Sequence, residues 1–183
     1  LSRMLPLLWI GMLFFLTFYT SPKARRAAVL MDATPMPPKQ YALVRCAAAL
    51  TGGALLSLLC MGEAAVFYGR MFRWYNWGSL LLPALVTLLP ALVFALGSGW
   101  LLGQLRPWLV YVWMAAPFLL AALPLPEALS LWNGRFFTAY PLTLGTLDPA
   151  FALPIGAVAA QAALLALGAA LLAAGGSRRK AMR

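Results

Sequence analysis

Five long apolar stretches, separated by short polar segments, dominate the 183-residue chain. They cover residues 5–19, 42–68, 80–105, 108–125 and 150–175. A helix rises about 1.5 Å per residue, so roughly 20 apolar residues cross the hydrocarbon core of a bilayer. The stretches are continuous rather than alternating, and lipid offers an open backbone no hydrogen-bond partners. The pattern therefore predicts an all-α integral membrane protein, a bundle of five transmembrane helices forming one domain over residues 1–183.

The basic residues are unevenly distributed between the polar segments and predict the topology. Of the 14 lysines and arginines, ten fall in alternate loops on one side. These are Lys23, Arg25, Arg26, Lys39, Arg45, Arg106, Arg178, Arg179, Lys180 and Arg183. Positively charged loops stay in the cytoplasm, so residues 20–40 and the C-terminal tail are expected there. The net charge of +10 is thus explained by topology, with membrane lipid rather than nucleic acid as the expected partner.

An odd number of spans with a cytoplasmic C-terminus places the N-terminus outside. The chain opens with Leu1 rather than Met. We expect that a preceding part of the protein is missing, and a cleaved secretory signal is the alternative.

The external segment 126–149 is too long and too apolar for a simple connection. Its bulky side chains are Leu129, Leu131, Trp132, Phe136, Phe137 and Tyr140. Their number predicts two short helical pieces, broken at Asn133 and Gly134, that lie in the interface or are partly re-entrant. A flexible surface loop is the alternative, and it would expose many aromatic rings to water.

Small residues recur at helical spacing within three of the spans and predict close helix packing. They are Ala49, Gly53 and Ser57, then Gly99 and Gly103, then Gly156, Ala159, Ala163, Ala166 and Ala170. Packing within the chain is the expected use, and a homodimer seam is the alternative.

The residue inventory argues against catalysis by this chain's own side chains. The sequence contains no histidine and four carboxylates, Asp32, Glu63, Glu127 and Asp148. It contains no Gly-rich loop ending in Lys followed by Ser or Thr, so no nucleotide site of the Walker type is expected, nor any cofactor or metal. Glu63 is the acid within a span, and it is expected to face the bundle interior or to reach Arg70 or Arg73. Either an interfacial structural role or a role in substrate passage would suit it.

The stretch 21–45 is the most specific part of the sequence. Residues 23–33 predict a short amphipathic helix, which Pro35, Pro37 and Pro38 end because the residue before a proline avoids helical geometry. Pro38 is then expected in the first turn of the next span. A short helix rigidly joined to a span could transmit a push from a cytoplasmic partner. A basic helix lying on the inner leaflet is the alternative.

Because of this segment, the chain resembles the membrane (permease) subunit of type-2 ABC exporters. In that family a short coupling helix ends in a Leu-rich stretch and a Pro-containing turn, and the next span begins shortly before a Lys or Arg. The matching residues are Leu30, Met31, Asp32, Ala33, Thr34, Pro35, Met36, Pro37 and Arg45. The chain departs from the family at residues 23–26, which are Lys, Ala, Arg and Arg where an acidic residue and a Gly-Thr pair are common.

The resemblance implies spans two to six of the family, with the first span absent. It implies a homodimer or heterodimer with a second permease in a bacterial inner membrane, and a cytoplasmic ABC ATPase subunit that grips the coupling segment 21–40. The coupling residues would be Arg25, Arg26, Leu30, Met31, Asp32 and Pro35. A substrate pathway could use Glu63, Ser57 and Gln104, and the scarcity of polar residues in the spans hints at an apolar cargo. The alternative function is a membrane scaffold or assembly subunit that transports nothing.

Overall fold

The computed structural model describes residues 4–21, 23–24, 38–73, 78–123 and 155–181, and this part of the chain is helical with no strand. Its helices of seven residues or more are α1 (Leu5–Thr20), α3 (Pro38–Phe72), α4 (Gly78–Leu105), α5 (Pro107–Met114), α6 (Ala116–Ala122) and α9 (Ile155–Ala181). The predicted all-α fold class is therefore confirmed over the described residues. The predicted external segment 126–149 lies outside them.

Among the described residues, three helices are long and apolar enough to cross a membrane, as judged by length and composition. They are Leu43–Phe72 in α3, Ala84–Leu105 in α4 and Val158–Gly175 in α9. The other two predicted spans are shorter in the structure, since α1 has 16 residues and the apolar segment of the fourth is Pro107–Leu119. The structure thus supports membrane-spanning helices without establishing a bundle of five spans.

The predicted fourth span, 108–125, is not one continuous helix. Helix α5 ends at Met114, and the Ala115 N–H turns back to the Val112 carbonyl at 3.1 Å before α6 begins. Pro117 explains the break, because it has no N–H to offer the carbonyl of Trp113 four residues earlier. That carbonyl instead accepts a hydrogen bond from Trp9 Nε1 of α1 at 3.1 Å. Hydropathy alone does not detect such an exchange of partners.

Proline and polar residues set the other helix boundaries where the sequence predicts them. Helix α3 begins at Pro38, as expected for a first-turn proline. The gap between the predicted spans 80–105 and 108–125 is a turn at Arg106, whose extended backbone (φ −147°) precedes Pro107 at the start of α5. Arg73 ends α3 in the left-handed region (φ 49°), a common way to terminate a helix.

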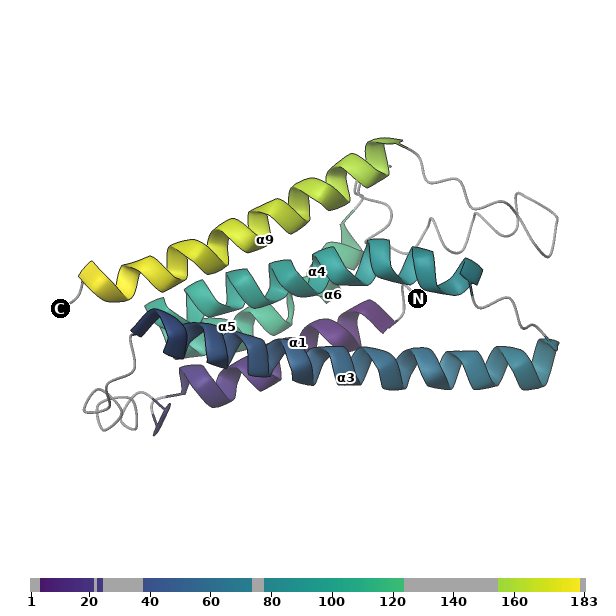
Figure 1. Ribbon diagram of the computed structural model, residues 1–183, viewed down its shortest axis with the longest axis horizontal. Helices are drawn as coiled ribbons and strands as arrows, with labels where there is room; N and C mark the ends of the chain where they lie inside the picture. Colours follow the sequence, from purple (N-terminus) through teal and green to yellow (C-terminus); the bar gives the residue numbers. More distant parts are fainter. Residues whose placement is uncertain (1–3, 22, 25–37, 74–77, 124–154, 182–183) are drawn as a thin grey trace.

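Helix α4 is the centre of the bundle. It packs against α9, α1 and α5, and 61% of its most apolar window is buried, against 17% for α3 and for α9. Figure 1 shows the helices running side by side along the long axis, with α9 and α3 on opposite sides of α4. The short helix α1 supplies the largest fully buried side chains, among them Leu8, Trp9, Met12, Leu13 and Leu16.

An aromatic cluster joins α1, α4 and α5 in the core. The rings of Trp9, Phe94 and Trp113 lie with centroids 5.8 to 6.4 Å apart. Trp113 Nε1 donates to Ser98 Oγ at 2.8 Å, and Ser98 Oγ donates to the Phe94 carbonyl at 2.6 Å. The polar atoms of this cluster are thus satisfied by neighbouring helices, as buried polar groups require.

Glycines allow the helices to approach one another closely. Gly53 of the predicted stripe on α3 lies against Met12, Gly52 against Phe15, and Gly99 of α4 against Leu13 and Leu16. These stripes therefore pack within the chain, as expected. The expected packing within the chain is wrong for the α9 stripe, because its five residues are exposed and the packed face carries Gln161, Gly168 and Gly175 instead. The alternative for this stripe, a homodimer seam, stays a prediction.

Candidate functional site

The residues that flank the predicted coupling segment meet at one end of the bundle. Arg45 Nη1 of α3 donates to the Tyr19 carbonyl of α1 at 3.4 Å, and its guanidinium lies 5.9 Å from the centre of the Tyr19 ring. A cation over an aromatic face is attracted by the ring quadrupole. Arg45, which the resemblance placed just after the coupling segment, thus holds the end of α1 against the start of α3.

Thr20, the next residue of α1, contacts the end of α4 at the same end of the bundle. Thr20 is 6% exposed, and its hydroxyl donates to the Leu16 carbonyl of its own helix at 3.2 Å. A side chain on Gly103 would meet Cγ2 of Thr20 and Cγ2 of Val110, so α1, α4 and α5 converge there. Only a glycine permits that approach without displacing a neighbour.

Helix α9 is connected to this end through Gln104. Its Nε2 donates to the Gly175 carbonyl of α9 at 2.9 Å. We call the group Tyr19, Thr20, Arg45, Gly103 and Gln104 the basal junction. It ties α1, α3, α4 and α9 together at the end where the predicted coupling segment leaves the bundle, on the left in Figure 1.

Ser21 turns the chain from α1 into the start of the predicted coupling helix. Its N–H donates to the Thr17 carbonyl at 3.0 Å, which completes the last turn of α1. Its Oγ accepts the N–H of Ala24 at 3.2 Å, and Lys23 and Ala24 are helical. An extended serine (ψ 155°) whose oxygen accepts the N–H three residues on is a helix N-cap. The sequence carried this signal as Ser21 before Pro22.

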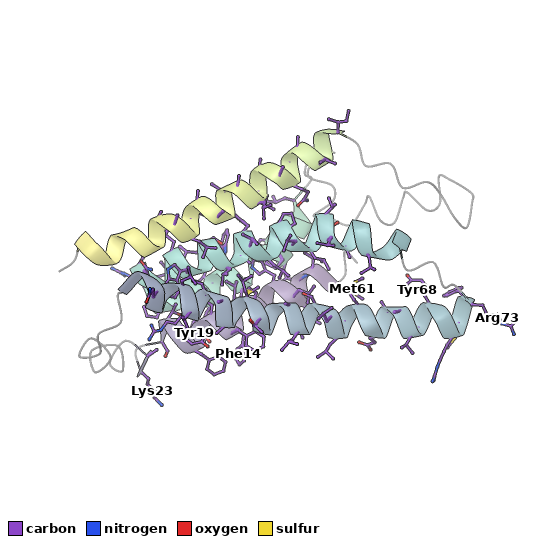
Figure 2. All side chains as sticks on the ribbon, in the orientation of Figure 1. Phe14, Tyr19, Lys23, Met61, Tyr68 and Arg73 are labelled. Atoms are coloured by element: carbon purple, nitrogen blue, oxygen red, sulfur yellow. The ribbon has the colours of Figure 1, made fainter. Side chains whose placement is uncertain are left out.

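All six predicted coupling residues lie outside the described residues, namely Arg25, Arg26, Leu30, Met31, Asp32 and Pro35. Lys23 is exposed and points away from the bundle at the end that contains Tyr19, whereas Tyr68 and Arg73 lie at the opposite end (Figure 2). The described part of the segment therefore leaves the bundle at the basal junction.

The three residues assigned to a possible substrate pathway are not brought together within the chain. Gln104 belongs to the basal junction. Ser57 is half-buried, and its Oγ donates to the Gly53 carbonyl of its own helix at 2.8 Å. Glu63 lies 18 residues beyond Arg45 on α3, about 27 Å along the helix axis. Its side chain is exposed, so the expectation that it faces the interior of this chain's bundle is wrong.

Comparison of the chain with family models, with curated proteins and with solved structures gave no match. The interpretation of the site therefore rests on its geometry.

The geometry of the basal junction favours a mechanical role over a chemical one. It contains a cation on an aromatic ring and two interhelical hydrogen bonds to backbone carbonyls. Each of these fixes the position of one helix relative to another. A force applied to the chain at Lys23 would reach α1 directly and α3 and α4 through their contacts with Tyr19 and Thr20.

Proposed function

We propose that this chain is the membrane-spanning subunit of an ATP-driven exporter and is moved by a separate cytoplasmic ATPase subunit. The observation that carries the proposal is the basal junction, where the two helices that bracket segment 21–37 are fastened together and to α4. This fastening would pass a movement of the segment on to α1, α3 and α4. The resemblance of residues 30–37 and Arg45 to the permease subunits of type-2 ABC exporters points the same way.

In this proposal five apolar segments cross a bacterial inner membrane, with the basal junction and the C-terminus in the cytoplasm. The two short segments, α1 and Pro107–Leu119, cross as part of the bundle. Hydrophobic side chains on the outside of α3, such as Leu55, Leu58 and Leu59, meet lipid or a second permease. Binding of ATP would bring two ATPase subunits together and tilt the coupling segments, and the tilt would move the spans.

The test is recovery of ATPase with the tagged chain. The chain is expressed with its native genomic neighbours, solubilised and affinity-purified, and Mg²⁺-dependent ATP hydrolysis is measured in the eluate. Leu30→Asp together with Met31→Asp is expected to lower the recovered activity at least tenfold, because two carboxylates would replace the apolar face that the ATPase grips.

The matched control is Met71→Asp together with Phe72→Asp, which introduces the same charges at the other end of α3, where both side chains are exposed. It is expected to leave the recovered ATPase activity unchanged. Equal recovery from both double variants, or no ATPase with the unaltered chain, would contradict the proposal and leave the membrane scaffold as the better interpretation.

A further inference from the structure

Gln161 is a buried polar side chain that the proposed function does not use. It lies on α9, is 5% exposed, and its Oε1 has no hydrogen-bond partner within the described part of the chain. Burying an amide oxygen without a donor is costly, so such an atom calls for an explanation.

The packing of α4 against α9 fixes the level of Gln161 along the bundle. These two helices run in the same direction, since Gly97 lies against Gly168 and Gln104 bonds to Gly175 seven residues further along both. Seven residues before the first of these pairs are Pro90 and Gln161, and both are buried. Seven residues make nearly two helical turns, so all three pairs lie on one seam.

Pro90 leaves a second acceptor without its normal donor at this level. A proline has no N–H, so the Val86 carbonyl one turn earlier lacks its helical hydrogen bond. A Cβ at Gly168 would meet the backbone of Val93 and Phe94, so the same register seven residues earlier places Gln161 at the level of Val86 and Thr87 on α4.

The chain shows elsewhere how such a carbonyl is satisfied. Pro117 frees the Trp113 carbonyl in the same way, and the indole N–H of Trp9 donates to it at 3.1 Å. On α9 the buried atom without a partner is Oε1 of Gln161, which is itself an acceptor. Two acceptors require a donor with two hydrogens between them.

The helices touch backbone to backbone at Gly168, where an added Cβ would lie 2.7 Å from the Phe94 nitrogen. Figure 1 shows α9 diverging from α4 toward its N-terminal end, which is the direction of Gln161. Side chains rather than backbones therefore meet at the level of Gln161.

We propose that the seam between α4 and α9 holds a buried water molecule at the Pro90 level. One of its hydrogens is donated to Gln161 Oε1 and the other to the Val86 carbonyl oxygen. A polar site with two or more partners is where buried water is found in proteins. The proposal does not depend on the ATPase, because it concerns the satisfaction of two buried atoms.

The first experiment locates the water by radiolytic footprinting. The full chain in lipid nanodiscs is exposed to X-rays shortly after mixing with H₂¹⁸O, and oxygen incorporation is read by mass spectrometry. Residues Val86 and Pro90 should be modified with slowly exchanging oxygen, at least fivefold above Leu13 and Leu16, which are fully buried in the core around α1. Gln161→Met should abolish the difference.

The second experiment is a double-mutant cycle between Gln161→Met and Pro90→Ala, measured as midpoints of thermal unfolding. Alanine returns an N–H to the Val86 carbonyl, so the midpoint loss caused by Gln161→Met should shrink by at least half in the Pro90→Ala background. Gln104→Met is the matched control, because that amide already donates to Gly175, and its effect should be the same in both backgrounds.

Each alternative outcome overturns the proposal. A rise in the midpoint for Gln161→Met would show a dry, unsatisfied amide. Coupling in the cycle without labelling at Val86 and Pro90 would show that the amide donates directly to the carbonyl. Labelling that persists in Gln161→Met would show water that the glutamine does not hold.

Discussion

At the scale of single residues, the structure is stabilised where a polar atom inside the bundle finds a donor or acceptor on another helix. Trp9 illustrates this best, because its ring packs in the aromatic cluster and its N–H satisfies the carbonyl that Pro117 has released. The indole thus contributes apolar contact and a specific hydrogen bond at once. The two contributions can be separated by substitution.

Replacing Trp9 by Phe should keep most of the ring contact and leave the Trp113 carbonyl without a donor. We expect a loss of about 1–3 kcal/mol in the free energy of unfolding, which is typical for an unsatisfied buried group. Circular dichroism during denaturant titration in mixed micelles measures it. Trp108→Phe, at a site where the indole is 54% exposed, should change the free energy by less than about 0.5 kcal/mol. Equal losses for the two variants would contradict the role of the hydrogen bond.

The contact between Arg45 and Tyr19 makes a different residue-scale prediction, because the ring face carries the attraction. Tyr19→Phe should leave stability unchanged, whereas Tyr19→Leu should lower it by about 0.5–1 kcal/mol, the usual size of an exposed cation–π contact. The Tyr19 carbonyl remains in both variants, so the hydrogen bond from Arg45 is retained. Thermal unfolding of the purified variants measures the difference, and a loss in Tyr19→Phe equal to that in Tyr19→Leu would contradict it.

At the scale of helices, the closest contact is the crossing of α4 and α9 at their glycines. A Cβ on Gly168 would stand 2.7 to 2.9 Å from backbone atoms of Val93 and Phe94, and backbone does not yield as the end of a side chain does. The seam therefore depends on glycine on both helices, since Gly97 also meets the Gly168 carbonyl.

Gly168→Ala is expected to push α9 from α4 and to lower the free energy of unfolding by about 1–3 kcal/mol, the range for overpacking. Gly62→Ala is the control, because nothing lies within 4 Å of a Cβ at that position of α3. It should be neutral or stabilise the chain by about 0.5–1 kcal/mol through helix propensity. If both variants behaved alike under the same thermal assay, the tight crossing would not be a determinant of stability.

The presence of the helices and most of their boundaries could be predicted from the sequence, whereas the residues through which they pack against one another could not. Apolar length and proline position identify α3 from Pro38 and the turn at Arg106, because both act locally. A kink at Pro117 could be expected because proline lacks an N–H, but the donor that the Trp113 carbonyl takes instead, Trp9 of α1, depends on the fold. In α9, small residues occur on every side, so only contact with α4 selects Gly168 and Gly175 as the packed face.

The candidate site, too, could be predicted from the sequence only in part. Its position along the chain follows from the charge and proline pattern of residues 21–45. The contact of Arg45 with the Tyr19 backbone joins residues 26 apart, and no local pattern encodes it. Because a carboxylate in lipid is costly, Glu63 was expected either inside the bundle or beside Arg70 or Arg73. Its exposure excludes the first, because the sequence does not tell which face of α3 meets α1.

At the scale of the whole molecule, the two ends of the bundle differ. One end holds the basal junction with Lys23 nearby, and the other extends along α3 to Arg73 (Figure 2). Helix α3 has 35 residues, or about 52 Å of rise, which exceeds the roughly 30 Å hydrocarbon core. Its ends are therefore expected in the aqueous phases on opposite sides of the membrane.

Cysteine accessibility tests this arrangement in intact cells. In a background where Cys46 and Cys60 are replaced by alanine, Arg73→Cys should react with a membrane-impermeant maleimide added outside. Lys23→Cys should react at least tenfold less until the cells are permeabilised. Reaction of both positions from the same side would contradict a span formed by α3 and the orientation proposed for the junction.

Ser21 has a consequence for how motion would pass through this molecule. The same residue closes the last turn of α1 with its N–H and opens the following turn with its hydroxyl. The connection between α1 and the coupling segment is therefore stiff. A rotation of the coupling segment would be passed to α1 with little loss. Inserting two glycines into this connection would make it flexible while leaving the contacts on either side in place.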